Sequence, residues 1–72
     1  MSPSLGEVLA RNLRRLRREK GLTQEELADR MGINRNYVGM IERCENSPTV
    51  DMLERIAKAL QVDPSFLLTR HK

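Results

Sequence analysis

Two short amphipathic segments joined by a glycine-containing turn, within residues 24–41, constrain the fold of this chain more than any other feature. Helices that cross closely need a small residue where their backbones meet, and Ala28 stands at that place. The turn needs a residue that adopts a positive φ without strain, which Gly32 provides. Apolar residues that let both helices face one core are Leu27, Met31, Ile33, Val38 and Ile41. The pattern predicts a helix, a tight turn and a second helix.

Capping residues set the limits of these two helices. Thr23 and Glu26 have the spacing of a capping box, so the first helix is predicted over residues 24–31. Asn34 is a favourable N-cap residue, and the second helix is predicted over residues 35–43. Both helices are short, so they need neighbours to bury their apolar faces.

Three further helices are predicted around this pair. The first covers residues 5–20 and is stopped by Gly21. Its expected apolar face comprises Leu5, Leu9, Leu13 and Leu16. Another begins after the N-cap residue Thr49, with an expected inner face of Val50, Leu53, Ile56, Ala57 and Leu60. Asp63 followed by Pro64 predicts the start of a last short helix. The fold class is therefore predicted to be all-α.

Length and residue usage exclude several classes of protein. Seventy-two residues allow a single domain, predicted over residues 1–72 with an ordered core of about residues 5–69. No apolar run exceeds three residues, so neither a membrane span nor a secretory signal is expected, and the chain is placed in the cytoplasm. Cys44 and His71 are the only residues of their types, so no disulfide, metal site or other cofactor is expected. His71 is assigned to an unstructured tail. Since no catalytic constellation is recognisable, the chain is not expected to be an enzyme.

Positive charge is concentrated at the start of the chain. Residues 1–20 contain six basic and two acidic residues, a net of +4, whereas residues 21–72 contain seven basic and eight acidic residues, a net of −1. Ten of the thirteen basic residues are arginine, which suits phosphate and base recognition. This clustering favours a nucleic-acid partner, although a run of charge is more often a solvated face.

The sequence resembles a known family of regulators in several segments. LTQEELA at residues 22–28, GI at residues 32–33 and LERIAKAL at residues 53–60 closely resemble the lambda-repressor-like (XRE/Cro-type) helix-turn-helix regulators. The resemblance extends from Leu13 to Leu68. It implies a five-helix fold and binding to double-stranded DNA as a two-fold homodimer on a palindromic operator. The second helix of the pair is then the recognition helix in the major groove.

The resemblance and the residue types together indicate which side chains contact DNA. Arginine pairs with guanine and asparagine with adenine, so Arg35 and Asn36 are the expected base readers. Gly39 either permits close approach to the bases or is a tolerated weak point, and Met40 either contacts a thymine methyl group or fills a partly buried place. The expected phosphate contacts are Thr23, Gln24, Tyr37, Arg43, Asn46 and Ser47. For Tyr37 the alternative is an exposed aromatic ring over the turn. The sequence leaves two positions open for four arginines of the first helix, which either reach DNA or point to solvent: Arg11, Arg14, Arg15 and Arg18.

Other residues have expected structural roles. The resemblance implies that Arg17 pairs with Glu42 and holds the first helix against the third. Leu68 is assigned to the core. The residues expected at the dimer interface are Pro64, Phe66 and Leu67. Cys44 stands where relatives carry glycine, and its Cβ leaves the left-handed turn expected there in question.

Two classes of function remain open from the sequence. The first is a sequence-specific transcription regulator. The second is a protein-interaction or antitoxin-type module that keeps the fold without binding DNA. Outward polar residues on the second helix of the pair, Arg35 and Asn36 above all, favour the regulator.

Overall fold

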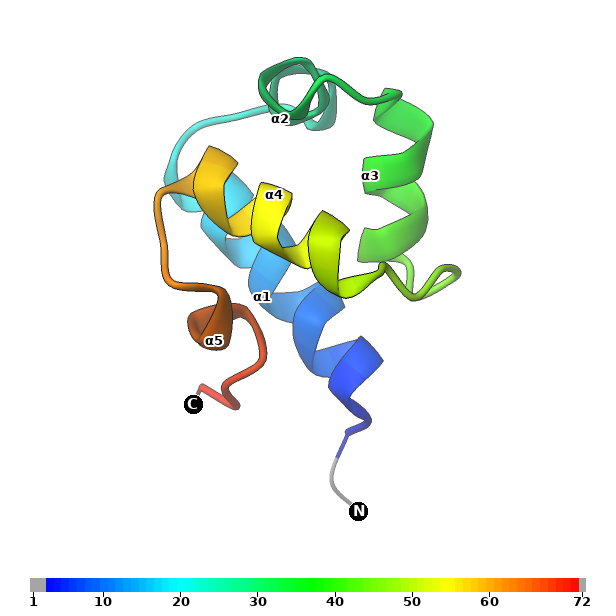
Figure 1. The fold of residues 1–72 in the computed structure, drawn as a ribbon, viewed down its shortest axis with the longest axis vertical. Coiled ribbons are helices and arrows are strands. Elements are labelled where there is room, and N and C mark those ends of the chain that lie inside the picture. Colours follow the sequence, from blue (N-terminus) through cyan, green and yellow to red (C-terminus); the bar gives the residue numbers. More distant parts are fainter. Residues whose placement is uncertain (1–2, 72) are drawn as a thin grey trace.

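The computed structural model describes residues 3–71, and these form five helices without a strand (Figure 1). The helices are α1 (Leu5–Glu19), α2 (Gln24–Met31), α3 (Arg35–Glu42), α4 (Val50–Leu60) and α5 (Pro64–Leu67). The predicted all-α class is confirmed, and the predicted helix limits agree with the structure to within one residue. Within residues 3–71, no helix is long and apolar enough to cross a membrane.

Each helix begins at a side chain that accepts a hydrogen bond from a backbone N–H of its first turn. The five N-cap residues are Ser4, Thr23, Asn34, Thr49 and Asp63. At α2 the predicted capping box is present, with Glu26 N–H donating to Thr23 Oγ1 at 3.0 Å and Thr23 N–H donating to Glu26 Oε1 at 2.9 Å. Ser4 and Glu7 form a second capping box at α1, which the sequence analysis did not identify.

The core receives side chains from every helix. α1 crosses the molecule behind α4 and packs against α3 and α5, while α2 packs against α3 and α4 (Figure 1). The largest side chains that are almost completely buried are Leu13, Leu27, Val38, Ile41, Ile56, Leu60 and Leu67. Because each short helix is anchored in this shared core, tertiary packing stabilises the helices more than their intrinsic propensity does.

The turn between α2 and α3 has the predicted geometry. Gly32 adopts the left-handed conformation, with φ 69° and ψ 34°. The N–H of Ile33 donates to the carbonyl of Ala28 at 3.0 Å, which satisfies a carbonyl at the end of α2. Ala28 itself is only 1% exposed, as expected for the small residue at a close crossing.

A left-handed residue also ends α3, although the residue there is not glycine. Cys44 has a φ of 59°, so the turn left in question by the sequence is retained. The N–H of Cys44 donates to Ile41 at 3.0 Å and that of Glu45 donates to Met40 at 2.8 Å. These two hydrogen bonds satisfy carbonyls of the last turn and offset the roughly 1–2 kcal/mol cost of the left-handed conformation for a residue with a Cβ.

The α5 segment corrects three predictions. Leu67 is completely buried, so its side chain is not available for the dimer contact predicted for it. Leu68, which was assigned to the core, is only half-buried and packs against the edge of the core. Asn12, which the sequence analysis did not single out, fixes this segment because its Nδ2 donates to the carbonyls of Leu67 at 2.8 Å and Thr69 at 2.9 Å. His71 is not part of an unstructured tail, since its ring lies 4.2 Å from the ring of Phe66 between centroids.

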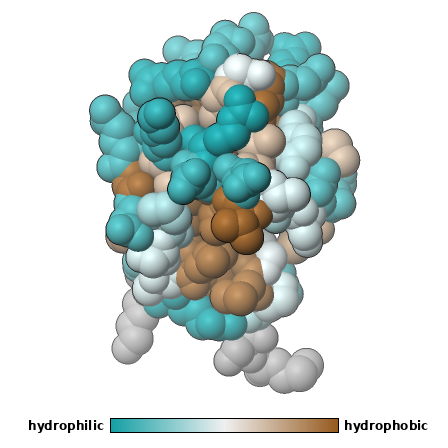
Figure 2. Space-filling view, in the orientation of Figure 1, coloured by the Kyte–Doolittle hydropathy of each residue, from teal (hydrophilic) through white to brown (hydrophobic). Residues whose placement is uncertain are grey.

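An apolar groove opens on the surface between α1, α4 and the chain that follows α5. Leu5 and Val50, both predicted to face the core, are instead 53% and 82% exposed. They line a groove of about 250 Å³ together with residues that include Leu9, Pro48, Leu53 and Leu68. Figure 2 shows apolar side chains gathered in the middle and lower part of this face, whereas the upper part is hydrophilic. We refer to this surface as the apolar groove.

Candidate nucleic-acid interface

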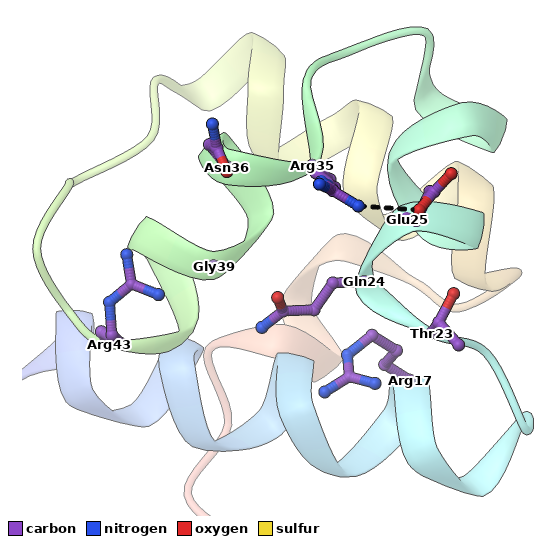
Figure 3. A pocket seen from close by; sticks show the side chains of 8 residues that line it. All are labelled: Arg17, Thr23, Gln24, Glu25, Arg35, Asn36, Gly39 and Arg43. Atoms are coloured by element: carbon purple, nitrogen blue, oxygen red, sulfur yellow. Dashed lines mark hydrogen bonds and ion pairs between the residues drawn. The ribbon is translucent and has the colours of Figure 1, made fainter.

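A polar groove of about 480 Å³ lies between α2 and α3, with one wall completed by α1 (Figure 3). The residues that line it are Arg17, Thr23, Gln24, Glu25, Arg35, Asn36, Gly39 and Arg43. We refer to it as the α2–α3 groove. Six of these eight residues were predicted to contact DNA, so the fold brings most of the expected interface together on one surface.

The two expected base readers lie at the start of α3. Arg35 is 66% exposed at its side chain, and its Nη1 donates to Oε2 of Glu25 on α2 at 3.0 Å. Asn36 is exposed, and its amide side chain points away from the other labelled side chains (Figure 3). Its backbone N–H donates to the N-cap side chain of Asn34 at 2.7 Å. Both side chains therefore present hydrogen-bonding groups at the N-terminal end of α3, the part of a recognition helix that reads base edges.

Gly39 and Met40 follow one turn later and differ in their surroundings. Gly39 lies in the α2–α3 groove, where a Cβ would stand 2.9 Å from Nη1 of Arg43 and 3.5 Å from Oε1 of Gln24. The absence of a side chain thus leaves room for these two polar groups. Met40 is half-buried and does not line the groove.

Thr23 and Gln24 occupy the N-terminus of α2, as predicted. Thr23 is exposed and forms the cap described above. Gln24 is half-buried because its Nε2 donates to Oε1 of Glu42 at 3.1 Å. Free backbone N–H groups and the helix dipole favour an anion at such a helix end.

The remaining expected phosphate contacts are dispersed. Arg43 lines the groove and is held by Glu45, with Nε to Oε2 at 2.8 Å and Nη2 to Oε1 at 3.3 Å. Tyr37 is half-buried and packs against the core, so it is not the exposed ring that was the alternative. Asn46 and Ser47 lie in the loop before α4 and do not line the α2–α3 groove, and Ser47 borders the apolar groove instead.

Behind the α2–α3 groove, a buried carboxylate joins three helices. Glu42 is 4% exposed and accepts hydrogen bonds from Arg17, with Nε to Oε2 at 2.6 Å and Nη2 to Oε1 at 3.1 Å. The pair implied by the resemblance is therefore present. Burial raises the pKa of the Glu42 carboxyl, but the hydrogen bonds from Arg17 and Gln24 and the positive charges of Arg17 and Arg14 outweigh it, so the pKa lies below its ordinary value.

Two partners of this network were missed by sequence reasoning. Gln24 shares the Glu42 carboxylate, and Arg14 donates from Nη2 to the backbone carbonyl of Glu42 at 2.7 Å. The only available signal was that Arg14 and Arg17 are three residues apart and so lie on one face of α1. Another basic residue of α1, Arg15, forms an ion pair with Glu19, with 3.2 Å between Nε and Oε1. Neither residue lines the α2–α3 groove. The groove lining includes one α1 arginine, Arg17.

Comparison with known proteins identifies the fold and the family. A model of the helix-turn-helix family matches residues 13–67. The control protein C.SmaI of Serratia marcescens is 44% identical over 64 residues, covering 89% of this chain and 76% of that protein. Among solved structures, the hypothetical transcription factor NHTF from Neisseria superposes with a TM-score of 0.89 at 41% identity, covering 92% of this chain and 76% of that chain.

A third relative has been solved with DNA. The restriction-modification controller protein C.Esp1396I, as a tetramer in complex with its natural 35 base-pair operator, superposes with a TM-score of 0.82 at 33% identity. The alignment covers 92% of this chain and 87% of that chain. The matched family model spans α2 and α3 completely and includes Arg14 and Arg17 of α1, so it covers the elements that line the α2–α3 groove and the network behind it. By sequence, fold and turn geometry alike, the chain belongs to the helix-turn-helix family.

Proposed function

We propose that this chain is a sequence-specific transcription regulator that binds double-stranded DNA in the cytoplasm, as a homodimer on a palindromic operator. The observation that carries the proposal is the α2–α3 groove, where the outward side chains of Arg35 and Asn36 share a surface with the N-terminus of α2. Arginine and asparagine are the residue types that pair bidentately with guanine and adenine. With α3 in the major groove, its first residues meet base edges while the start of α2 meets the phosphate backbone.

The phosphate contacts follow from the same placement. Thr23 and Gln24 supply the α2 terminus, and Arg43 lies at the other end of α3 on the same groove. Arg43 reaches a phosphate by exchanging its carboxylate partner for a phosphate oxygen, since an exposed ion pair contributes little stability. Asn46 and Ser47 lie in the loop that joins α3 to α4. We propose that they contact the DNA phosphate backbone at the edge of the interface.

The apolar groove supports the homodimer. Exposed apolar side chains at Leu5 and Val50 continue the apolar faces of α1 and α4, although no part of residues 3–71 covers them. A contiguous apolar surface of this kind is typical of a protein contact. We assign the main dimer contact to this groove. Of the residues of α5 that were predicted at the dimer interface, Pro64 and Phe66 are exposed. They remain candidates for the edge of the dimer contact.

Selection of bound sequences from a random duplex pool tests this function. A regulator of this kind selects a palindrome with half-sites about 34 Å apart or a multiple of that spacing. Arg35→Ala should lower affinity for the selected duplex by roughly tenfold to a hundredfold and relax the preference at one base position. Arg30→Ala is the matched control, because Arg30 is an exposed arginine of α2 that does not line the α2–α3 groove. Absence of any retained duplex at low salt would favour the protein-interaction module instead.

A further inference from the structure

Glu25 is the one acidic side chain among the described residues that line the α2–α3 groove. A carboxylate facing DNA weakens binding, because the electrostatic part of the affinity grows with the number of phosphates that the protein neutralises. Glu25 is favourable near the N-terminus of α2, but Glu26 already supplies an acidic residue there within the capping box. The place of Glu25 in the groove therefore requires another explanation.

The geometry of its partner supplies that explanation. Oε2 of Glu25 accepts a hydrogen bond from Nη1 of Arg35 at 3.0 Å, which joins the start of α2 to the start of α3 (Figure 3). Within residues 3–71, Nε and Nη2 of Arg35 donate to no protein acceptor. These two N–H groups form one edge of the planar guanidinium. Two parallel donors on one edge match the O6 and N7 acceptors of guanine.

Arg43 shows the opposite arrangement on the same groove. Its Nε and Nη2 both donate to Glu45, so the edge that is open in Arg35 is occupied in Arg43. Arg43 must leave its carboxylate before that edge can bind DNA, whereas Arg35 can keep its contact with Glu25 and bind a base at the same time. Both ion pairs are exposed, so both can exchange. The two arginines differ in whether the Nε–Nη2 edge is open while the ion pair is formed.

We propose that Glu25 is a specificity-determining residue that positions Arg35 for guanine and against phosphate. The inference rests on the proposed function and deepens it. An arginine paired with a carboxylate has no net charge, so it adds little to charge-driven binding of any duplex. The pair still offers two donors to guanine, whose recognition depends on hydrogen-bond geometry rather than on charge. Glu25 therefore suppresses non-specific binding more than specific binding.

Glu25→Gln tests this assignment, because glutamine keeps an acceptor for Arg35 and removes the charge. Affinity is measured at several salt concentrations for two duplexes, the one selected by the wild-type protein and a scrambled duplex of equal length. For the scrambled duplex, affinity should rise about fivefold near 0.15 M salt, and the log–log salt slope should steepen by about 0.9. Affinity for the selected duplex should rise less, so the ratio of the two affinities falls.

Two controls separate this effect from a simple gain of net charge. Glu54→Gln makes the same change in charge on α4, at an exposed residue outside the groove, and should leave the ratio unchanged. In an Arg35→Ala background, Glu25→Gln should no longer alter the ratio, because Glu25 acts through Arg35. If Glu25→Gln behaves like Glu54→Gln, Glu25 does not determine specificity. A wild-type protein that binds both duplexes equally would overturn the proposed function, and this inference with it.

Discussion

Glu42 is the single residue on which most of the polar structure behind the groove depends. It is 4% exposed, and removal of its carboxylate leaves the guanidinium of Arg17 without its partner in a site where that side chain is only 11% exposed. We expect Glu42→Ala to lower the free energy of unfolding by about 3 kcal/mol at pH 7, as found when one partner of a buried pair is removed. Urea denaturation measures this loss. The matched control Glu54→Ala, at an exposed residue of α4, should change stability by less than about 0.5 kcal/mol.

The same carboxyl gives the stability a definite pH dependence. Its pKa in the folded protein lies below the ordinary value of 4.5, so the unfolded chain binds a proton more readily than the folded one. The stabilisation is fully present above pH 4.5 and is lost as the pH falls through the lower folded value. The difference in stability between wild type and Glu42→Ala should therefore be constant near neutrality and shrink in acid. A difference that grows as the pH falls would contradict the direction of this shift.

Gly39 is a second residue whose substitution separates stability from binding. Alanine in a helix interior is more favourable than glycine by about 1 kcal/mol, and the nearest atoms to the added Cβ belong to the side-chain ends of Arg43 and Gln24, not to the backbone. Gly39→Ala should therefore raise the free energy of unfolding by up to about 1 kcal/mol and weaken DNA binding, because the Cβ displaces Arg43 within the groove. Chemical denaturation and mobility-shift titration measure the two effects.

Single-residue roles in the interface were only partly predictable. The resemblance predicted the Arg17–Glu42 pair, which the structure contains. Residue chemistry predicted Arg35 and Asn36 as base readers, and that role stays a prediction. Neither indicated that Glu25 pairs with Arg35, because these residues are ten positions apart and meet only after α2 and α3 cross. The partner of a long side chain depends on which helices lie next to each other in the fold, and the spacing of residues along the sequence does not determine this.

At the scale of elements, the helix limits were predictable because each helix carries its own start and stop signals. Cap residues act within a single turn, so sequence spacing determines them. What could not be predicted at α5, a helix of four residues, was which side chain faces the core, because three consecutive apolar residues span its end and its C-cap, Phe66, Leu67 and Leu68. One helical turn offers no period from which to choose the inward residue. In the structure Leu67 takes that place and Leu68 is half-buried, while Asn12 donates to the carbonyls of Leu67 and Thr69 on either side of Leu68.

The helix caps provide a prediction at this scale, since α2 and α4 both begin at threonine. Thr23 accepts from Glu26 N–H at 3.0 Å, and Thr49 accepts from Met52 N–H at 3.1 Å. Thr23→Ala and Thr49→Ala should each lower the free energy of unfolding by about 1 kcal/mol. Thr23→Ala should weaken DNA binding beyond this loss, because Thr23 lines the α2–α3 groove and Thr49 does not. Thr49 lines the apolar groove, so the two affinities are compared at protein concentrations at which both variants are dimeric. Equal losses of affinity in the two variants would remove Thr23 from the interface.

At the scale of the whole molecule, the apolar groove determines the expected assembly. Val50 is 82% exposed, so Val50→Glu should leave the fold intact while placing a charge in the proposed dimer contact. Sedimentation equilibrium should show a monomer for this variant and a dimer for the wild type, with a large loss of affinity for the palindrome. Phe66→Ala tests the surface predicted on α5 and should leave the dimer in place. A dimeric Val50→Glu together with a monomeric Phe66→Ala would move the interface to α5.

The apolar groove also marks the limit of pattern-based prediction. Helical periodicity identified Leu5 and Val50 as apolar-face residues, but periodicity is the same whether a face is covered by the rest of the chain or by a second copy. Both residues sit at the first position of their helices, at the margin of the core. Only the positions of the neighbouring helices show that they remain uncovered.

The anchoring of α5 by Asn12 has a consequence for the order of events during synthesis. Asn12 emerges from the ribosome well before Leu67, yet the Asn12 side chain donates to the carbonyl of Leu67, whose own side chain is completely buried in the core. Until Leu67 has left the exit tunnel, the nascent chain lacks one of the five helices that seal its interior. Folding of this domain is therefore completed only after Leu67 has emerged from the exit tunnel.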